Sequence, residues 1–204
     1  MFPKKYGFPL AVLALCLILG GYLLWSQKKD SELPIEQQGA PFSYTDLDGQ
    51  TVSLDNTNGK VRLLYFFFAN CPDVCPPTTF MLSQVQNQLK EAGLFGDKAQ
   101  LLSVTIDPAR DTVDSLKKFG DQFNADYSGW KFLRGDEKAT EELAKKYQIW
   151  VSKDSPESFS HMNLIVLLDK KGQVREWISA KDYIEMGADN LPVSNIVDKI
   201  KSLI

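Results

Sequence analysis

A run of mainly apolar residues, 61–69, leads directly into two cysteines of this 204-residue chain. The run is short, rich in aromatic side chains and followed by turn-forming residues, which favours a fully buried strand over a helix. Cys71 and Cys75 then lie at the carboxyl end of that strand. Pro76 and Pro77 follow, and proline suits the first turn of a helix because its missing N–H would have no partner there. We therefore expect a strand, a cysteine-bearing loop and a helix in succession.

These two cysteines form the single cysteine pair of the part expected to be soluble, because Cys16 lies in an apolar N-terminal segment. This count argues against a disulfide scaffold and for one reactive or metal-binding dithiol. A structural disulfide between Cys71 and Cys75 is the alternative in an oxidising compartment, although so small a loop would stabilise the fold little. Because a helix N-terminus stabilises thiolates, we expect a lowered pKa for Cys75 and, less directly, for Cys71.

The N-terminal segment has the features of a membrane anchor. Lys4 and Lys5 precede residues 7–25, which carry no charge. That length can span a hydrocarbon core of about 30 Å. We predict a single-pass transmembrane helix within residues 1–26, located in the cell membrane. Since a short N-terminus stays in the cytoplasm, the soluble part is expected on the extracytoplasmic side.

Two other interpretations of this segment are a cleaved signal peptide and a lipoprotein signal around Cys16. No small-x-small cleavage site follows the apolar run, and Leu15 is large where lipoprotein signals usually have a small residue. Residues 27–40 are polar, contain Pro34 and Gly39 and show no periodicity. We therefore predict that they form a linker.

Residues 41–204 alternate between strand and helix patterns. Apolar or alternating residues predict strands over 42–45, 51–54, 61–69, 99–106, 130–133, 163–168 and 174–178. Helical spacing predicts helices over 77–92, 112–123, 137–147 and 194–204. The polar stretch 151–160 is expected to be a mobile loop. This order specifies an α/β fold with a mixed sheet flanked by helices, similar to a thioredoxin-like domain with an extra N-terminal β-hairpin.

The chain contains one histidine, His161, which the polar stretch would deliver to the start of the strand over 163–168. A histidine at a strand edge that bonds only to water is the alternative. Two thiolates and one imidazole form a soft to borderline ligand set, which favours copper, especially Cu(I), or zinc. Closed structural zinc sites usually have four protein ligands, so a three-ligand site suits a metal that is passed on.

Charged residues limit the partners of this chain. The formal net charge of -3 is spread over both signs. It provides no basic face, which argues against binding of nucleic acid. Asp107, Arg110 and Asp111 would either form an ion-pair network beside the loop after a strand or remain solvated surface charges.

Three segments together closely resemble the Sco/SenC/PrrC family. They are residues 68–76 around the cysteines, residues 105–112, and His161 ahead of a strand that closes at residues 168–169. The segments occur in the family's order, and the likeness extends from about residue 41 to the C-terminus. The chain departs from the family pattern at residues 77–78, where an acidic residue is common, and at residues 162–163, where many relatives have serine or threonine.

The resemblance implies a membrane-anchored, thioredoxin-like copper protein that assists assembly of cytochrome c oxidase at the binuclear copper centre of subunit II. The implied ligands of Cu(I) or Cu(II) are Cys71, Cys75 and His161, within a copper-binding domain over residues 41–204. Other copper chaperones and thioredoxin-like reductants are implied as further partners.

Three functions remain open at this point. The first is a copper metallochaperone without catalytic residues. The second is a thiol–disulfide oxidoreductase in which Cys71 and Cys75 form the redox-active dithiol and reduce the cysteines of the oxidase subunit. The third is a copper or redox sensor. Dependence on His161 separates the first two, because copper binding needs the imidazole and dithiol exchange does not.

Overall fold

The computed structural model describes residues 12–22, 33–155, 158–186 and 193–204. Its contacts separate two units, Met1–Leu33 and Pro34–Ile204, which we describe individually. In the first unit, residues 12–22 form a helix. Within the described ranges, no helix combines the length and the apolar character needed to cross a membrane. The predicted anchor over residues 1–26 lies largely outside the described residues.

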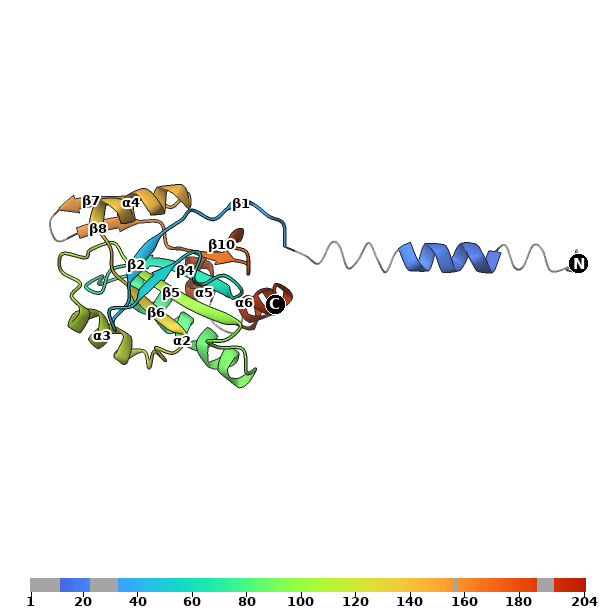
Figure 1. The fold of residues 1–204 in the computed structure, drawn as a ribbon, viewed down its shortest axis with the longest axis horizontal. Helices are drawn as coiled ribbons and strands as arrows, with labels where there is room; N and C mark the ends of the chain where they lie inside the picture. Colours follow the sequence, from blue (N-terminus) through green and yellow to red (C-terminus); the bar gives the residue numbers. More distant parts are fainter. Residues whose placement is uncertain (1–11, 23–32, 156–157, 187–192) are drawn as a thin grey trace, which may run out of the picture. The chain divides into compact units, whose positions relative to one another are not determined.

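A six-stranded mixed sheet forms the centre of the second unit (Figure 1). In spatial order its strands are β1 (Gln37–Gln38), β10 (Gln173–Ser179), β9 (Leu164–Leu168), β4 (Val61–Phe67), β5 (Ala99–Thr105) and β6 (Trp130–Leu133). β4, β5 and β6 run parallel, whereas β9 is antiparallel to β4 and β10 is antiparallel to β9. The prediction of a mixed α/β sheet is confirmed. β1 belongs to the segment predicted as a linker and pairs with β10.

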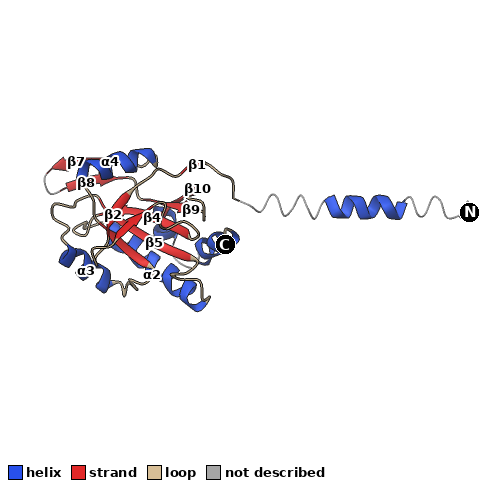
Figure 2. Cartoon of the chain, viewed as in Figure 1, coloured by secondary structure: helices blue, strands red, loops and turns tan. Residues whose placement is uncertain are grey.

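Helices flank this sheet (Figure 2). They are α2 (Cys75–Glu91), α3 (Val113–Gln122), α4 (Glu137–Lys146), α5 (Ala180–Met186) and α6 (Ser194–Ser202). Because successive residues of a strand point to opposite faces, aromatic pairs show which face a helix covers. Phe67 of β4 stacks on Phe119 of α3, whereas Phe66 contacts Tyr147, which follows α4. α3 and α4 therefore cover opposite faces, while α2 packs against α5 and α6.

The strand that leads into the cysteines lies in the centre of the core. Every residue of β4 and of its parallel neighbour β5 is buried. Tyr65 and Phe67 stack with ring centroids 6.1 Å apart, and Phe67 meets Phe132 of β6 edge-on at 5.7 Å. Apart from Arg62, the run is apolar, as a strand covered on both faces requires. The carboxyl end of β4 is therefore a rigid base for the loop that follows.

Two short hairpins accompany the main sheet. β2 (Ser43–Thr45) and β3 (Thr51–Ser53) form the predicted entry hairpin. β7 (Val151–Ser155) and β8 (Ser158–His161) form an antiparallel pair, so the described residues of the stretch 151–160 are strands where we had predicted a loop. His161 is consequently the last residue of β8. We had expected it at the start of the following strand, β9. α2 also begins earlier than predicted, at Cys75, and α5 was not predicted.

Contacts between distant residues explain why the pattern of β7 and β8 misled us. Lys153 of β7 pairs with Glu137 of α4 at 2.7 Å, and its ammonium group lies 5.3 Å from the centroid of the Phe159 ring. Phe159 of β8 packs against Phe68, with ring centroids 5.5 Å apart. Figure 1 accordingly shows both strands beside α4. A polar hairpin that depends on such non-local contacts has no strong periodicity of its own.

Candidate metal and dithiol site

The two cysteines lie between the end of β4 and the first turn of α2. The backbone N–H of Cys71 donates to the carbonyl of Phe68 at 3.2 Å, which turns the chain away from the sheet. Cys75 is the first residue of α2, with a proline directly after it. Both cysteines carry free thiols. Cys75 is fully buried and Cys71 retains 8% exposure, so an external group would meet Cys71 first.

His161 lies beside this pair. Its Nε2 atom is 3.7 Å from the Sγ atom of Cys75. Its Nδ1 atom is 3.2 Å from the carbonyl oxygen of Met162. A proton on Nδ1 that is donated to this carbonyl leaves the Nε2 lone pair facing the sulfur. The imidazole also packs edge-on against Phe68, with ring centroids 6.1 Å apart. The structure thus brings His161 from the second hairpin to the N-terminus of α2.

An open pocket of about 560 Å³ gives access to the site. It is lined by residues 70–74, residues 159–161 and Phe68. The walls combine two aromatic rings with the edge of the cysteine loop. A protein segment or a small ligand can therefore approach Cys71 and His161 from the same side, while Cys75 stays beneath them.

The two thiols differ in acidity. Hydrogen bonding with the Cys75 side chain lowers the pKa of Cys71 to about 4, with a smaller contribution from His161. The same hydrogen bond, together with burial, raises the pKa of Cys75 far above its ordinary range. We had expected the helix dipole to favour the thiolate chiefly at Cys75, and this was wrong. Cys75 is fully buried, so its proton stays on the sulfur, and the more accessible Cys71 is the thiol that ionises first.

This difference predicts an unusual pH profile for alkylation. The rate at which iodoacetamide modifies Cys71, followed by peptide-resolved mass spectrometry, should stay nearly constant from pH 8 to about pH 5 and fall near pH 4, where the thiolate becomes protonated. An ordinary thiol, with a pKa of about 8.5, loses about tenfold in rate per pH unit below that value. Cys75→Ala is the matched control, because it removes the thiol donor without adding a hydroxyl, and it should move the profile of Cys71 to higher pH. An ordinary thiol profile for wild-type Cys71 would refute this assignment.

A hydrogen-bonded pair ties the histidine segment to α2. Thr78 is fully buried, and its hydroxyl donates to the carbonyl of Val74 at 2.7 Å. The Asn163 amide donates to the same hydroxyl oxygen at 3.0 Å. Asn163 is two residues beyond His161, and Thr78 is one turn beyond Cys75, so this contact fixes the two segments relative to each other. The sequence showed both residues only as departures from a family pattern, and nothing in it indicated that they meet.

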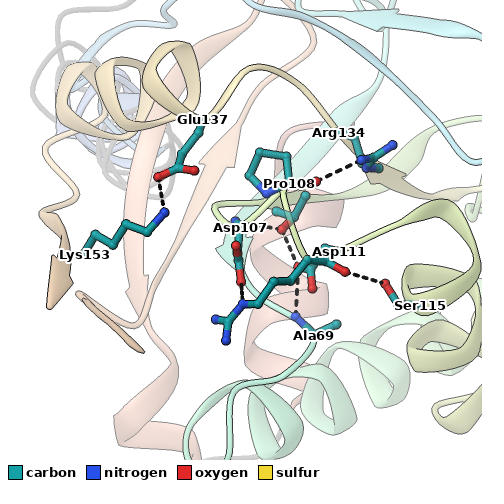
Figure 3. Close-up of polar contacts among 10 residues, drawn as sticks. Ala69, Asp107, Pro108, Asp111, Ser115, Arg134, Glu137 and Lys153 are labelled. Atoms are coloured by element: carbon teal, nitrogen blue, oxygen red, sulfur yellow. Dashed lines mark hydrogen bonds and ion pairs between the residues drawn. The ribbon is translucent and has the colours of Figure 1, made fainter. Parts of the chain in front are cut away.

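Two buried carboxylates, Asp107 and Asp111, lie next to the residue that precedes the cysteine loop, and Figure 3 shows their polar contacts. Asp111 accepts hydrogen bonds from the backbone N–H of Ala69, at 3.0 Å, and from the hydroxyl of Thr105. Arg110 forms an ion pair with Asp107, which is also buried. The predicted ion-pair network is therefore present only in part: Arg110 pairs with Asp107, whereas Asp111 is held by hydrogen bonds. Its contact with Ala69 joins the loop after β5 to the residue that precedes the cysteine motif.

The sulfur atoms of Cys71 and Cys75 and the imidazole of His161 are chemically suited to a soft metal ion. Their positions suit such an ion only in part. Ligand atoms about 2.3 Å (sulfur) and 2.0 Å (nitrogen) from one ion lie roughly 3.5–3.7 Å apart at tetrahedral or trigonal angles. The distance of 3.7 Å between Cys75 and His161 agrees with this range. In the described part of the chain, however, no three histidine, cysteine, aspartate or glutamate side chains are placed so as to hold an ion. Side-chain adjustment would have to accompany three-ligand binding.

The fold and the site together define a class of protein: a mixed α/β domain with a reduced dithiol after its central strand and a histidine beside the thiols. The model of the SCO1/SenC family matches residues 31–192. The chain therefore belongs to the SCO1/SenC family.

Individual relatives agree with this assignment. The SCO1 protein homolog of Bacillus subtilis is 31% identical over 172 residues, which cover 83% of this chain and 84% of the relative. The structure of BsSco, described as a disulfide switch in a member of the Sco family of cytochrome c oxidase assembly proteins, is 29% identical. It has a TM-score of 0.70, covering 83% of this chain and 95% of that one. Yeast Sco1 with copper bound is 29% identical, with a TM-score of 0.66, covering 82% and 91%.

Proposed function

We propose that this chain is a copper protein of cytochrome c oxidase assembly, which binds copper through Cys71, Cys75 and His161 and delivers it to the binuclear copper site of subunit II. Membership of the family supports the copper-related assembly role, since one similar structure holds copper and another is described as an oxidase assembly protein. The recipient subunit and the three ligands are the more specific parts of the proposal.

One observation carries this proposal: the approach of the His161 Nε2 atom to the Cys75 Sγ atom, at 3.7 Å. The two residues come from the second hairpin and from α2, and a dithiol enzyme needs no imidazole at that place. Two sulfurs and one nitrogen suit copper, and a shell of three protein ligands leaves room for a ligand of the recipient. The open pocket beside Cys71 and His161 provides the direction from which such a recipient ligand can arrive.

The oxidation state of the dithiol would control loading. When Cys71 and Cys75 form a disulfide, the two thiols release two electrons and two protons to an oxidant, and both sulfurs are lost as thiolate ligands. Copper uptake therefore requires the reduced form. The free thiols of the structure correspond to that form.

Anaerobic titration of the reduced protein with Cu(I) and Cu(II) tests the proposal. Wild type should bind one copper ion, and the Cu(II) form should show a thiolate-to-copper charge-transfer band. Cys71→Ser and Cys75→Ser should each abolish the band and the stoichiometric binding, because each removes a sulfur ligand. Cys16→Ser is the control outside the site and should bind as wild type does. Unchanged binding in either site variant would refute the three-ligand site.

A second candidate function is thiol–disulfide exchange that reduces the cysteines of the recipient subunit. The low pKa of Cys71 and its partial exposure favour it. The Cys71 thiolate would attack one sulfur of the partner disulfide and release the other as a thiolate. Cys75 would then lose its proton and attack Cys71, which yields the Cys71–Cys75 disulfide and a reduced partner dithiol.

We also propose that the chain consists of a membrane anchor, a linker and a copper-binding domain. Residues 1–26 would anchor it in the cell membrane as a single pass, the part of residues 27–40 that precedes β1 would act as a linker, and residues 41–204 would hold the copper site on the extracytoplasmic side. The uncharged length of residues 7–25 supports the anchor. Other copper chaperones or thioredoxin-like reductants would load or reduce the site.

A further inference from the structure

His161 lies at the end of a hairpin that depends on other parts of the domain for its position. β7 and β8 form a two-stranded sheet of their own, separate from the central sheet. A two-stranded hairpin by itself is only marginally stable in water. The position of the imidazole therefore depends on the contacts that its neighbours make with the rest of the domain. Asn163, two residues further along the chain, makes one of these contacts.

Thr78, the partner of Asn163, makes more contacts than its place in a helix requires. Its hydroxyl donates to the carbonyl of Val74 at 2.7 Å, although that carbonyl also accepts the backbone N–H of Thr78 at 3.2 Å. The neighbouring Thr79 makes the same kind of bond, with its hydroxyl 2.7 Å from the carbonyl oxygen of Cys75, and both threonines are buried. In the described part of the chain, Thr78 and not Thr79 also binds the histidine segment, since the Asn163 amide donates to its hydroxyl oxygen at 3.0 Å.

Asn163 also fixes the peptide group that faces the imidazole. Its own carbonyl oxygen accepts the backbone N–H of Ala180, the first residue of α5, at 3.2 Å, so Asn163 is held by α5 as well as by Thr78. The carbonyl of Met162 belongs to the peptide bond that joins Met162 to Asn163. Its oxygen lies 3.2 Å from the Nδ1 atom of His161. A carbonyl at this place orients a ligating imidazole, so fixing Asn163 fixes the ring.

We propose that Thr78 and Asn163 are positioning residues: their hydrogen bond holds the segment after β8 against α2 and so keeps the His161 imidazole beside the Cys75 sulfur before copper binds. The role in copper binding rests on the copper function proposed above. A ligand that is already in place loses less conformational freedom when the metal binds, which raises the affinity.

Thr78→Val and Asn163→Leu each remove one partner of this hydrogen bond with little change in side-chain volume. The chain has one histidine, so the imidazole of the full-length, reduced, metal-free protein gives a single set of NMR signals. We expect both variants to weaken the nuclear Overhauser contact between the His161 and Phe68 rings, whose centroids are 6.1 Å apart, and to lower the order parameter of the imidazole. Cu(I) affinity, measured against a competing chelator, should fall about tenfold.

Thr79→Val is the matched control, because it removes a buried hydroxyl that makes the same bond along α2. It should leave the imidazole order and the Cu(I) affinity as in wild type. Thr78→Ser keeps the hydroxyl and should also behave as wild type. The double variant Thr78→Val/Asn163→Leu should lose no more than either single variant, because the same hydrogen bond is removed in all three.

An imidazole as well ordered in Thr78→Val and Asn163→Leu as in wild type would overturn the inference. Losses that add up in the double variant, or an equal loss in Thr79→Val, would overturn it too, since either result would indicate a general loosening of the start of α2. Greater mobility of the imidazole with unchanged Cu(I) affinity would refute the role in copper binding. If wild type itself binds no copper, the proposed function fails, and the NMR comparison of the metal-free proteins alone decides whether the pair positions His161.

Discussion

The His161→Ala protein should bind Cu(I) at least about a hundredfold more weakly than wild type and still exchange disulfides at a similar rate. Loss of a residue that merely orients a metal ligand costs about 10- to 100-fold in affinity, so loss of a ligand should cost at least the upper value. The thiolate of Cys71 should survive, because hydrogen bonding with Cys75 is the main cause of its low pKa. Competition with a chelator measures the first quantity, and reduction of a small aromatic disulfide measures the second.

Met162→Leu is the matched control for this experiment. Met162 follows His161 directly and is exposed, so its thioether is the other soft donor next to the imidazole. Copper affinity should be unchanged in Met162→Leu. If His161→Ala binds copper as wild type does, the chaperone proposal loses its third ligand and the oxidoreductase becomes the better account. A loss confined to Met162→Leu would assign the ligand to the thioether.

The central strand and the cysteine loop could be predicted because their causes are local. A mainly apolar run is compatible with burial on both faces, and the prolines after Cys75 mark a helix start. The second hairpin could not be predicted in this way. β7 and β8 are polar, and they are held by the ion pair of Lys153 with Glu137 and by the packing of Phe159 on Phe68. Contacts between residues that are distant in sequence do not produce a periodic pattern of apolar residues.

In the candidate site, too, some features could be predicted from the sequence and others depend on contacts between distant residues. The sequence indicated Cys71, Cys75 and His161 by residue type and spacing, and the structure brings the histidine to the cysteines. The helix N-terminus led us to expect the more acidic thiol at Cys75, whereas the pKa difference between the two thiols comes from burial and from their mutual hydrogen bond.

Asp111→Ala should lower the free energy of unfolding by about 2–4 kcal/mol. The change leaves the Ala69 N–H and the Thr105 hydroxyl without their carboxylate acceptor in a buried region, and each unsatisfied group costs about 1–3 kcal/mol. Because Ala69 precedes the cysteine motif, the loop should also lose its fixed geometry, and copper affinity should fall along with stability. Urea unfolding followed by circular dichroism measures the stability, and the copper titration measures the second effect.

Asp111→Asn separates the hydrogen bonds of this residue from its charge. The amide oxygen can accept from both donors, so we expect this variant to be at least as stable as wild type near pH 7. Burial raises the pKa of Asp111, which means that the folded state holds a proton at pH values where the unfolded chain has released it. The contribution of wild-type Asp111 to the free energy of unfolding therefore increases as the pH falls through the raised pKa. The stability difference between Asp111→Asn and wild type should become smaller over the same pH range. If Asp111→Asn were as unstable as Asp111→Ala at every pH, the negative charge of the carboxylate, and not its hydrogen bonds alone, would be what stabilises the loop.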